Sequence, residues 1–460
     1  MTGITEQLAD YVAALSFEDL PHDVGQRTKF LLLDMAGIAI RARHEADSNE
    51  SVRSALAQLG MAAGSASVFG DAQGYAPPAA ALFNGTLAHS LDFDDTHAAG
   101  SIHSSAPIVP AALAAAELSG CDGKTLIAGI VAGYEVQIRL SLALVPKEHY
   151  LRGFHPTATC GTFGAAAAAA RVFSLSAKQV VDAFGVCGSQ AAGSMQFLVN
   201  GAWNKRLHVG AAAMNGLMAA QFAKQGFKGA SEAIEGKDGF LNSYTPNAVP
   251  ERVLENLGQV YETMAIAVKP YPSCRYSHAA IDGIRSILDK NKVEAEEIQD
   301  VEIGLPRTGW NIIGNPLAEK QQPKNVVDGQ FSMPFVAAVA LREGDMQWDH
   351  YAQHLGDSFT LSLCKKITTV VDPLAEAEFP KQMSGVARVR TERGQFEKFV
   401  KIPKGEPENF LSEAELLNKF DGLVGPYVED EKAEQFIKAI LDVDNAKDIN
   451  GLIQLTGPGG

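Results

Sequence analysis

Titratable side chains are concentrated in residues 87–117, where the sequence reads LAHSLDFDDTHAAGSIHSSAPIVPAALAAAE. Three Asp, three His and one Thr lie here between two helical patterns that are rich in small residues. Side chains at the point where periodicity stops can converge on a cleft while the flanking helices hold them still. Asp and His are the residue types of acid/base catalysis and of metal coordination. The candidates for such chemistry are Asp92, Asp94, Asp95, Thr96, His97 and His103.

Two other interpretations of this cluster stay open. In the first, Asp94 or Asp95 caps a helix, Thr96 belongs to a turn and the histidines are solvated. In the second, the Asp and His side chains bind a metal ion. Because the spacing contains neither HExxH nor the alternating acidic loop of a calcium site, we expect no metal here.

Other catalytic signatures are missing from the sequence. Neither a GxGxxG motif after a strand nor the GxxxxGK[ST] loop occurs, and there is no serine nucleophile elbow. The cysteines are too scattered for a disulfide framework, a CxxC metal site or an iron-sulfur cluster. Acid/base chemistry without a cofactor is the enzymatic interpretation that remains. The five cysteines are Cys121, Cys160, Cys187, Cys274 and Cys364.

The elements that must position these residues are predicted to be helices. From Thr5 to about Ala265 one helical pattern follows another, rich in Ala, Leu and Gly, which permits close helix contacts. Pro21 fits the first turn of a helix, and Pro107 and Pro110 fit the first turns of another. Residues 177–199 predict a long buried helix that is broken by glycines.

The pattern becomes mixed from Lys269 to about Glu406. Residues 301–305 predict a strand, residues 331–341 a helix, and the run from Val386 a hairpin that turns at Gly394. Beyond Ser412 the pattern is helical again to about Leu441.

Four sequence blocks, in this order, resemble the MmgE/PrpD family, which contains 2-methylcitrate dehydratases, cis-aconitate decarboxylases and iminodisuccinate epimerase. The first is DFDDTH, followed by a His and a helix rich in Pro and Ala. The others are GFHPTATCGTFGAAAAAA from Gly153, NKRLHVGAAAMNG from Asn204 and KPYPSCRYSHAAID from Lys269. The resemblance covers most of the chain.

The resemblance implies a mainly α fold with two domains. Residues 1–267 and 407–460 would form a discontinuous all-helical domain, and residues 268–406 a smaller α+β lid domain. It also implies a homodimer that needs no cofactor and acts on a small polycarboxylate substrate.

The chemistry shared by the family is proton transfer at a carbon next to a carboxylate, which requires that the developing enediolate-like charge be stabilised. The resemblance implies that Lys205 and Lys269 bind substrate carboxylates and that His103 and His155 transfer protons. Asp92 would orient a His or Lys, and Thr96 would form a hydrogen bond.

The net charge of −15 disfavours nucleic acid and anionic membrane as partners. An acidic protein that binds a polycarboxylate must concentrate positive charge locally, and the motif blocks contain the candidate groups. For Arg206 and Arg275 a surface or structural role is about as plausible as function. The groups are Lys205, Arg206, His208, Lys269, Arg275 and His278. Arg206, His278 and Cys274 are further candidates for substrate binding.

Two departures from the family pattern concern the reaction. Cys274 stands where the decarboxylase members carry His, and Phe335 stands where several members carry Tyr. Both changes remove a polar group that could touch substrate and so disfavour decarboxylation, although Cys274 itself could serve as an acid or base.

We expect a cytoplasmic protein without a membrane span, because no charge-free apolar stretch reaches about 20 residues and the first residues show no signal-peptide pattern. The function expected first is a 2-methylcitrate dehydratase-like lyase reaction. An epimerase of an iminodisuccinate-like dicarboxylate, a cis-aconitate decarboxylase, and a helical protein that binds a polycarboxylate without catalysis are the alternatives.

Overall fold

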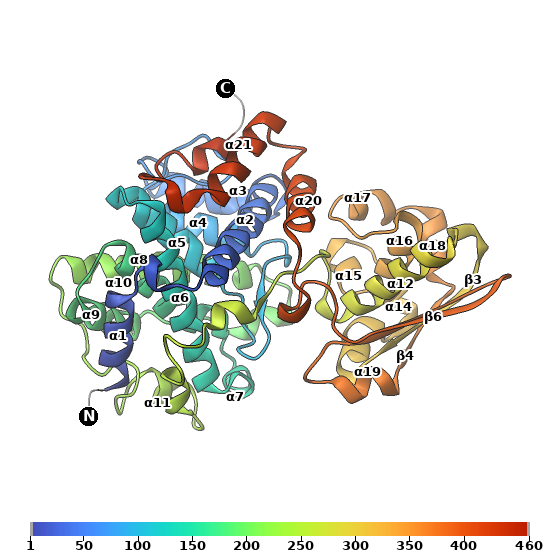
Figure 1. The fold of residues 1–460 in the computed structure, drawn as a ribbon, viewed down its shortest axis with the longest axis horizontal. Coiled ribbons are helices and arrows are strands. Elements are labelled where there is room, and N and C mark those ends of the chain that lie inside the picture. Colours follow the sequence, from blue (N-terminus) through green and yellow to red (C-terminus); the bar gives the residue numbers. More distant parts are fainter. Residues whose placement is uncertain (1–2, 458–460) are drawn as a thin grey trace. The chain divides into compact units, whose positions relative to one another are not determined.

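The computed structural model describes residues 3–457 and divides the chain into two compact units (Figure 1). Unit 1 comprises Met1–Ala267 with Leu416–Gly460, and unit 2 comprises Val268–Glu415. Unit 1 is built from helices with one two-stranded pairing, whereas unit 2 carries a four-stranded sheet. The fold is therefore mainly α with a small α+β part, as the sequence predicted.

The second boundary between the units lies after Glu415, not after Glu406 as we expected. Residues 407–415 stay with unit 2 because two contacts fasten them to the segment before them. The backbone N–H of Gly405 donates to the carbonyl of Asn409 at 3.0 Å, and Nζ of Lys404 lies 2.9 Å from the Glu415 carboxylate. A composition shift does not reveal such contacts.

Unit 1 gathers long helices around a core rich in Ala and Gly. Its helices are α1 (Ile4–Ala14), α2 (His22–Glu45), α3 (Asn49–Gln58), α4 (Pro77–Ala88), α5 (Ser105–Ser119), α6 (Gly123–Leu144), α7 (Pro146–Leu151), α8 (Pro156–Val172), α9 (Ala177–Cys187), α10 (Asn204–Lys224), α11 (Phe240–Tyr244), most of α20 (Glu413–Val424) and α21 (Asp430–Leu441).

Two helix contacts in unit 1 depend on glycine. A Cβ on Gly164 of α8 would lie 2.7 Å from the carbonyl oxygen of Gly133 on α6. A Cβ on Gly210 of α10 would lie 2.2 Å from the carbonyl oxygen of Leu82 on α4, and one on Gly85 would lie 2.9 Å from the Cα of Gly210. Because atoms cannot approach so closely, only glycine lets these helices touch backbone to backbone.

The contact between α4 and α10 brings the two helix ends that carry polar side chains together. Gly85 lies four residues before His89, and Gly210 lies five residues after Lys205. The C-terminal end of α4 therefore meets the N-terminal end of α10. The strand pairing of β1 (Thr96–His97) with β2 (Ile266–Ala267) fixes the loop that follows α4.

Helix α6 is long and apolar enough to cross a membrane by length and composition, but 94% of its most apolar window is buried in unit 1. It also carries a buried ion pair, in which Nε of Arg139 lies 3.1 Å from Glu135. These features are typical of a core helix.

The predicted helix over residues 177–199 is wrong in its second half. Helix α9 ends at Cys187, and residues 188–194 turn toward the start of α8. The N–H of His155 donates to the carbonyl of Gly193 at 2.9 Å, and the N–H of Met195 donates to Gly153 at 2.9 Å. Gly193 has φ +152, and a Cβ there would lie 3.0 Å from Ala158, so glycine is needed where this segment crosses α8.

Unit 2 contains a sheet with strand order β4-β3-β5-β6. Strands β3 (Ile298–Leu305) and β4 (Ile367–Val371) are parallel, and β5 (Gly385–Thr391) pairs antiparallel with β3 and with β6 (Gly394–Val400). Thr391 pairs with Gly394, which confirms the hairpin. The helices are α12 (His278–Asn291), α13 (Arg307–Gly309), α14 (Leu317–Lys320), α15 (Val326–Gln330), α16 (Met333–Glu343), α17 (His350–His354), α18 (Ser358–Cys364) and α19 (Pro373–Glu378).

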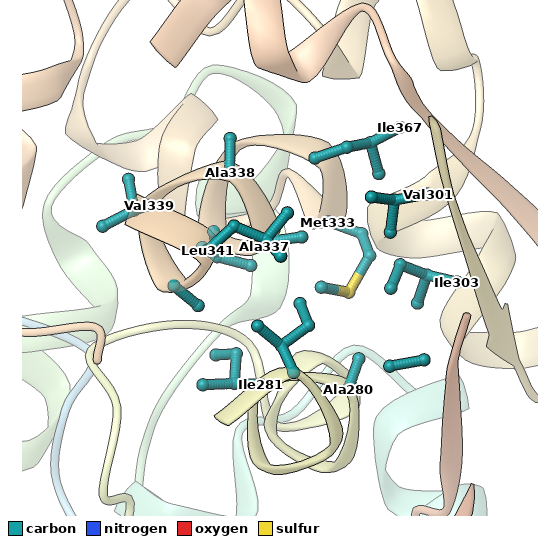
Figure 2. Close-up of a cluster of buried hydrophobic side chains, with 14 of the residues drawn as sticks. Ala280, Ile281, Val301, Ile303, Met333, Ala337, Ala338, Val339, Leu341 and Ile367 are labelled. Carbon is teal, nitrogen blue, oxygen red and sulfur yellow. The ribbon is translucent and has the colours of Figure 1, made fainter. Parts of the chain in front are cut away.

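The core of unit 2 lies between the sheet and helices α12 and α16. Figure 2 shows Val301 and Ile303 of β3 and Ile367 of β4 facing Met333 and Ala337 of α16. On α12, Ala280 and Ile281 point into the same cluster. The alternation in β3 that predicted a strand therefore corresponds to a buried face.

A buried lysine, Lys419, binds the loop after α4. Nζ of Lys419 on α20 lies 2.5 Å from the Asp34 carboxylate on α2 and 3.8 Å from the centre of the Phe93 ring. It also donates to the carbonyl of Phe93 at 3.3 Å. The Lys419 and Asp34 side chains are only 6% and 2% exposed, so the pair is strong only while both partners are present.

We predict that Lys419→Met lowers the free energy of unfolding by about 3–5 kcal/mol, because it leaves the buried Asp34 charge without its partner. The double variant Lys419→Met/Asp34→Leu is expected to regain most of this loss. Urea unfolding measures both. The control is Lys124→Met, which removes an exposed pair with Glu18 and should change little. Wild-type stability in Lys419→Met would contradict the assigned role.

Candidate active site

The carboxylate of Asp94 lies between two histidine rings in the loop after α4. Its Oδ2 atom is 2.6 Å from Nδ1 of His89 and 3.1 Å from Nδ1 of His103. The first contact is a hydrogen bond, whereas the second has the distance of an ion pair without hydrogen-bond alignment. The ring centres of His89 and His103 are 4.6 Å apart, so one buried oxygen holds two imidazoles.

The electrostatics of this group follow from burial and from the facing rings. Burial by itself raises the pKa of Asp94, but the facing His103 and His89 hold that pKa well below its ordinary value. Burial lowers the pKa of His89 to about 4. At neutral pH Asp94 is therefore an anion and His89 is neutral, and the proton of the short contact resides on Nδ1 of His89.

Asp95 binds the start of helix α5, as the capping interpretation expected. Its carboxylate accepts the backbone N–H groups of Ser104 at 3.0 Å and Ser105 at 3.1 Å, and it also accepts the Ser105 hydroxyl. Burial raises the pKa of Asp95 to about 6. Asp95 thus fixes the turn that carries His103 and is not free for chemistry.

Lys205 lies in the first turn of α10 and is paired with Asp92. Its Nζ atom is 2.9 Å from Oδ1 of Asp92, and its side chain is 34% exposed. Burial lowers the pKa of Lys205, but the Asp92 carboxylate outweighs it and the net pKa is raised. Lys205 is therefore a cation at neutral pH. Asp92 was predicted to orient a His or Lys, and that role requires a contact of this kind.

His155 lies directly before α8 and faces other rings. Its ring centre is 6.0 Å from that of His89 and 5.8 Å from that of His208 on α10, and Phe197 packs beside both. Burial, together with His89 and Lys205, lowers the pKa of His155 well below its ordinary value. Burial lowers the pKa of His208 as well. Both rings are neutral at neutral pH and can accept protons.

Thr96 and His97 occupy the short strand β1 and play different parts. His97 holds the loop together, because Nδ1 accepts the N–H of Gly100 at 3.0 Å and Nε2 lies 3.2 Å from Glu262. Thr96 is 9% exposed, and its buried hydroxyl has no hydrogen-bond partner among the described residues.

Many buried polar atoms of this cluster lack hydrogen bonds within residues 3–457. Native proteins leave few such atoms, so a group of them in one place indicates a site for water or ligand. They are Nε2 of His89, Oδ1 of Asp94, Oγ1 of Thr96, Oγ of Ser104, Oε1 of Gln137, Nδ1 of His155 and Nδ1 of His208.

Three helix N-termini border the same cluster. Asp95 binds the first N–H groups of α5, His155 precedes α8, and Lys205 lies in the first turn of α10. Helix N-termini carry partial positive charge and favour anions. Asp95 already occupies the end of α5. The cluster thus combines one fixed cation, the N-termini of α8 and α10, and neutral imidazoles, an arrangement suited to an anion that exchanges a proton.

The structure brings five of the predicted site residues together in unit 1. Asp92, Thr96, His103, His155 and Lys205 belong to the unit 1 cluster. Arg206 points toward Ser48, with Nη1 3.5 Å from its Oγ.

Lys269, Cys274 and His278 belong to unit 2. Lys269 is 5% exposed. The His278 ring lies 3.2 Å from the carbonyl of Ser273 and packs edge-on against Tyr271. Arg275 pairs with Glu406. His278 and Arg275 therefore have structural contacts within unit 2.

Phe335 is fully buried in the unit 2 core and stacks on Tyr351 at 5.9 Å. That the missing hydroxyl at this position removes a substrate contact stays a prediction.

The sequence did not single out His89 among the site residues and indicated His208 only as a candidate for positive charge. His89 ends the helical pattern of α4 and so looked like part of a helix, although it lies in the same polar stretch as Asp94. His208 lies three residues after Lys205, and residues three apart share a helix face.

The donor atoms of His89, Asp94 and His103 lie within 4.8 Å of one another, a spacing that could hold a metal ion. The contacts favour a proton instead. Two ring nitrogens meet a single carboxylate oxygen, and 2.6 Å between Nδ1 of His89 and Asp94 is the length of a charge-assisted hydrogen bond. A nitrogen that donates a proton to this oxygen, as Nδ1 of His89 does, has no lone pair for an ion.

The fold is helical, and its site combines buried Asp and His side chains with one lysine that is paired with Asp92. These features are those of a class of proteins that carry out acid/base chemistry on an anion. Residues 6–252 match the MmgE/PrpD N-terminal domain, and residues 271–445 match the MmgE/PrpD C-terminal domain. The chain belongs to the MmgE/PrpD family.

Similar curated proteins cover nearly the whole chain. The cis-aconitate decarboxylase-like protein oryM of Aspergillus oryzae is 28% identical over 98% of this chain and 97% of its own. The cis-aconitate decarboxylase of Aspergillus terreus is 25% identical over 99% and 96%. That of Mus musculus is 23% identical over 99% and 93%. Family and relatives support an enzyme with a lyase-type reaction.

We predict that activity and melting temperature survive exhaustive chelation, because the His89, Asp94 and His103 donors are engaged with one another. The measurement is turnover after dialysis against EDTA, with metal content determined on the same sample. Loss of turnover that a single divalent ion restores would contradict this and would make the three residues a metal site.

We predict that Lys205→Met and Lys269→Met each weaken binding of a carboxylate ligand by about 2–5 kcal/mol, since each removes a positive charge partner for a carboxylate. Isothermal titration and KM measure the effect. Lys224→Met is the control, because it lies on the same helix about 28 Å from Lys205. Unchanged KM and kcat in a variant would remove that lysine from the site.

Proposed function

We propose that the protein is a cofactor-independent lyase that acts on a small polycarboxylate, with His103 transferring the proton at a carbon next to a carboxylate. The contact between Asp94 and Nδ1 of His103 carries this proposal. A carboxylate that faces Nδ1 favours the tautomer with its proton there and leaves Nε2 for the reacting group. The His103 side chain is 16% exposed, whereas that of His89 is fully buried.

The surroundings of His103 suit a substrate with several carboxylates. Lys205 and the N-termini of α8 and α10 offer positive charge to a carboxylate, which lowers the energy of the enediolate-like state. His155 is neutral, because burial lowers its pKa, and it is the second imidazole beside His89. The buried polar atoms without partners supply further hydrogen-bonding positions.

Decarboxylation of a cis-aconitate-like tricarboxylate is the first candidate reaction, because the relatives that cover the chain end to end carry that name. The bond to one carboxyl group breaks, CO₂ leaves, the electron pair moves toward the remaining unsaturated carboxylate, and protonated His103 delivers a proton to carbon. Cys274, where decarboxylase members of the family carry His, is the feature that speaks against it.

Dehydration of a 2-methylcitrate-like hydroxy acid, which the sequence favoured first, is the second candidate. It needs one group to remove the α-proton and another to protonate the departing hydroxyl, and His103 and His155 offer two separate imidazoles. Epimerisation needs the same proton removal, with return of the proton on the other face. Incubation with citrate, methylcitrate, the aconitate isomers, tartrate and iminodisuccinate distinguishes these reactions by CO₂ release and by proton NMR of the products.

A helical protein that binds polycarboxylates without catalysis is the alternative from another class. It predicts saturable binding of a panel compound with no turnover. It also predicts that His103 can be replaced without functional loss.

We predict that His103→Gln lowers kcat by about 10²–10⁴ and leaves the melting temperature nearly unchanged, since acid/base steps contribute that much and the side chain is partly exposed. Both quantities are measured on one preparation. His22→Gln, a surface substitution at the start of α2, is the matched control. A destabilised but fully active His103→Gln would falsify the assignment of proton transfer to this residue.

A further inference from the structure

We propose that His89 is a positioning residue that acts on His103 through Asp94. Its ring holds the Asp94 carboxylate in the orientation in which the same oxygen lies against Nδ1 of His103. The inference rests on the proposed function only in taking His103 as the group that transfers the proton. The contact between His89 and Asp94 can be tested without turnover.

The hydrogen bond from His89 is the better-formed of the two contacts on Asp94. It is 2.6 Å long and aligned, whereas the contact with His103 is 3.1 Å and not aligned. Among the described residues no other hydrogen-bond donor reaches Oδ2, and Oδ1 has none. Without His89 the carboxylate would keep only its contact with His103.

Burial separates the roles of the two rings. The His89 side chain is 0% exposed, and its Nε2 atom is buried without a partner, so the ring is held on the carboxylate side only. His103 is the ring with access to the outside. His89 therefore acts through Asp94 and needs no contact with the reacting atoms.

The hydrogen bond also moderates the charge that His103 meets. A donated N–H stabilises a carboxylate anion and weakens its attraction for a facing imidazolium. Removing the donor should therefore make His103 hold its proton more strongly. Other charged or titratable groups lie around His89, Asp94 and His103 and stay unchanged in a His89 variant. Lys205 on α10, Asp95 in the loop, His155 before α8 and Asp34 on α2 act on them directly, whereas Asp92 is paired with Lys205 and His208 faces His155.

Three substitutions separate the hydrogen bond from the ring. The amide of Asn can place an N–H where Nδ1 of His89 lies, so His89→Asn keeps the donor. His89→Gln places its amide near the position of Nε2, and His89→Leu has no donor. Circular dichroism and melting temperature identify the variants that are folded, and either His89→Gln or His89→Leu is sufficient for the comparison.

The decisive measurement is the His103 titration in the ligand-free protein, followed by NMR on ¹³C-labelled histidine. The midpoint should rise by about one pH unit in His89→Leu and His89→Gln, and should stay at the wild-type value in His89→Asn. An unchanged midpoint in folded His89→Leu or His89→Gln overturns the proposal.

Turnover supplies a second readout. In His89→Leu the pH profile of kcat should shift by the same amount as the NMR midpoint, with kcat about 10-fold lower and KM unchanged, and His89→Asn should restore most of the rate. A wild-type pH profile in His89→Leu overturns the role in catalysis. If the wild-type protein turns over no compound of the panel, the proposed function fails, while the NMR titration still decides whether His89 controls His103.

Discussion

A buried carboxylate must be paired or hydrogen-bonded, and the carboxylate of Asp94 in unit 1 is fully buried. Two imidazoles satisfy this requirement, one at the end of α4 and one in the turn before α5. An anion left alone at this depth would take up a proton or destabilise the fold. The requirement therefore fixes two separate chain segments around one oxygen atom, and that arrangement leaves an oriented histidine at the edge of the cluster.

Glycines that lie several residues away from the site side chains make this arrangement possible. Gly85 and Gly210 let α4 and α10 touch along their backbones, so that Lys205 arrives beside the loop after α4. Gly193 lets the segment after α9 cross the start of α8 and bind the backbone of His155. Each glycine acts several residues away from the side chain that it positions. Replacement by alanine would therefore change the site without touching a polar group.

Sequence patterns correctly predicted the elements that bury one face. They gave a wrong prediction where a segment makes its hydrogen bonds with a part of the chain that is distant in sequence. The alternation of residues 301–305 and the turn at Gly394 predicted a strand and a hairpin because burial there is local to the sheet. Residues 188–194 read GSQAAGS between two apolar runs, which together looked like one helix, yet their partners lie at the start of α8. The Asp and His types of the loop predicted a site, but only three-dimensional contacts separate Asp95, which caps a helix, from Asp94, which orients His103.

We propose that Asp94 orients His103 to exchange a proton with the carbon next to a substrate carboxylate. Proton NMR in deuterated buffer measures this exchange, with wild type and Asp94→Asn incubated with the same polycarboxylates. Wild type should place solvent deuterium at that carbon, in product or recovered substrate, and folded Asp94→Asn should incorporate it at least about 100-fold more slowly. Incorporation at the wild-type rate in Asp94→Asn would contradict it.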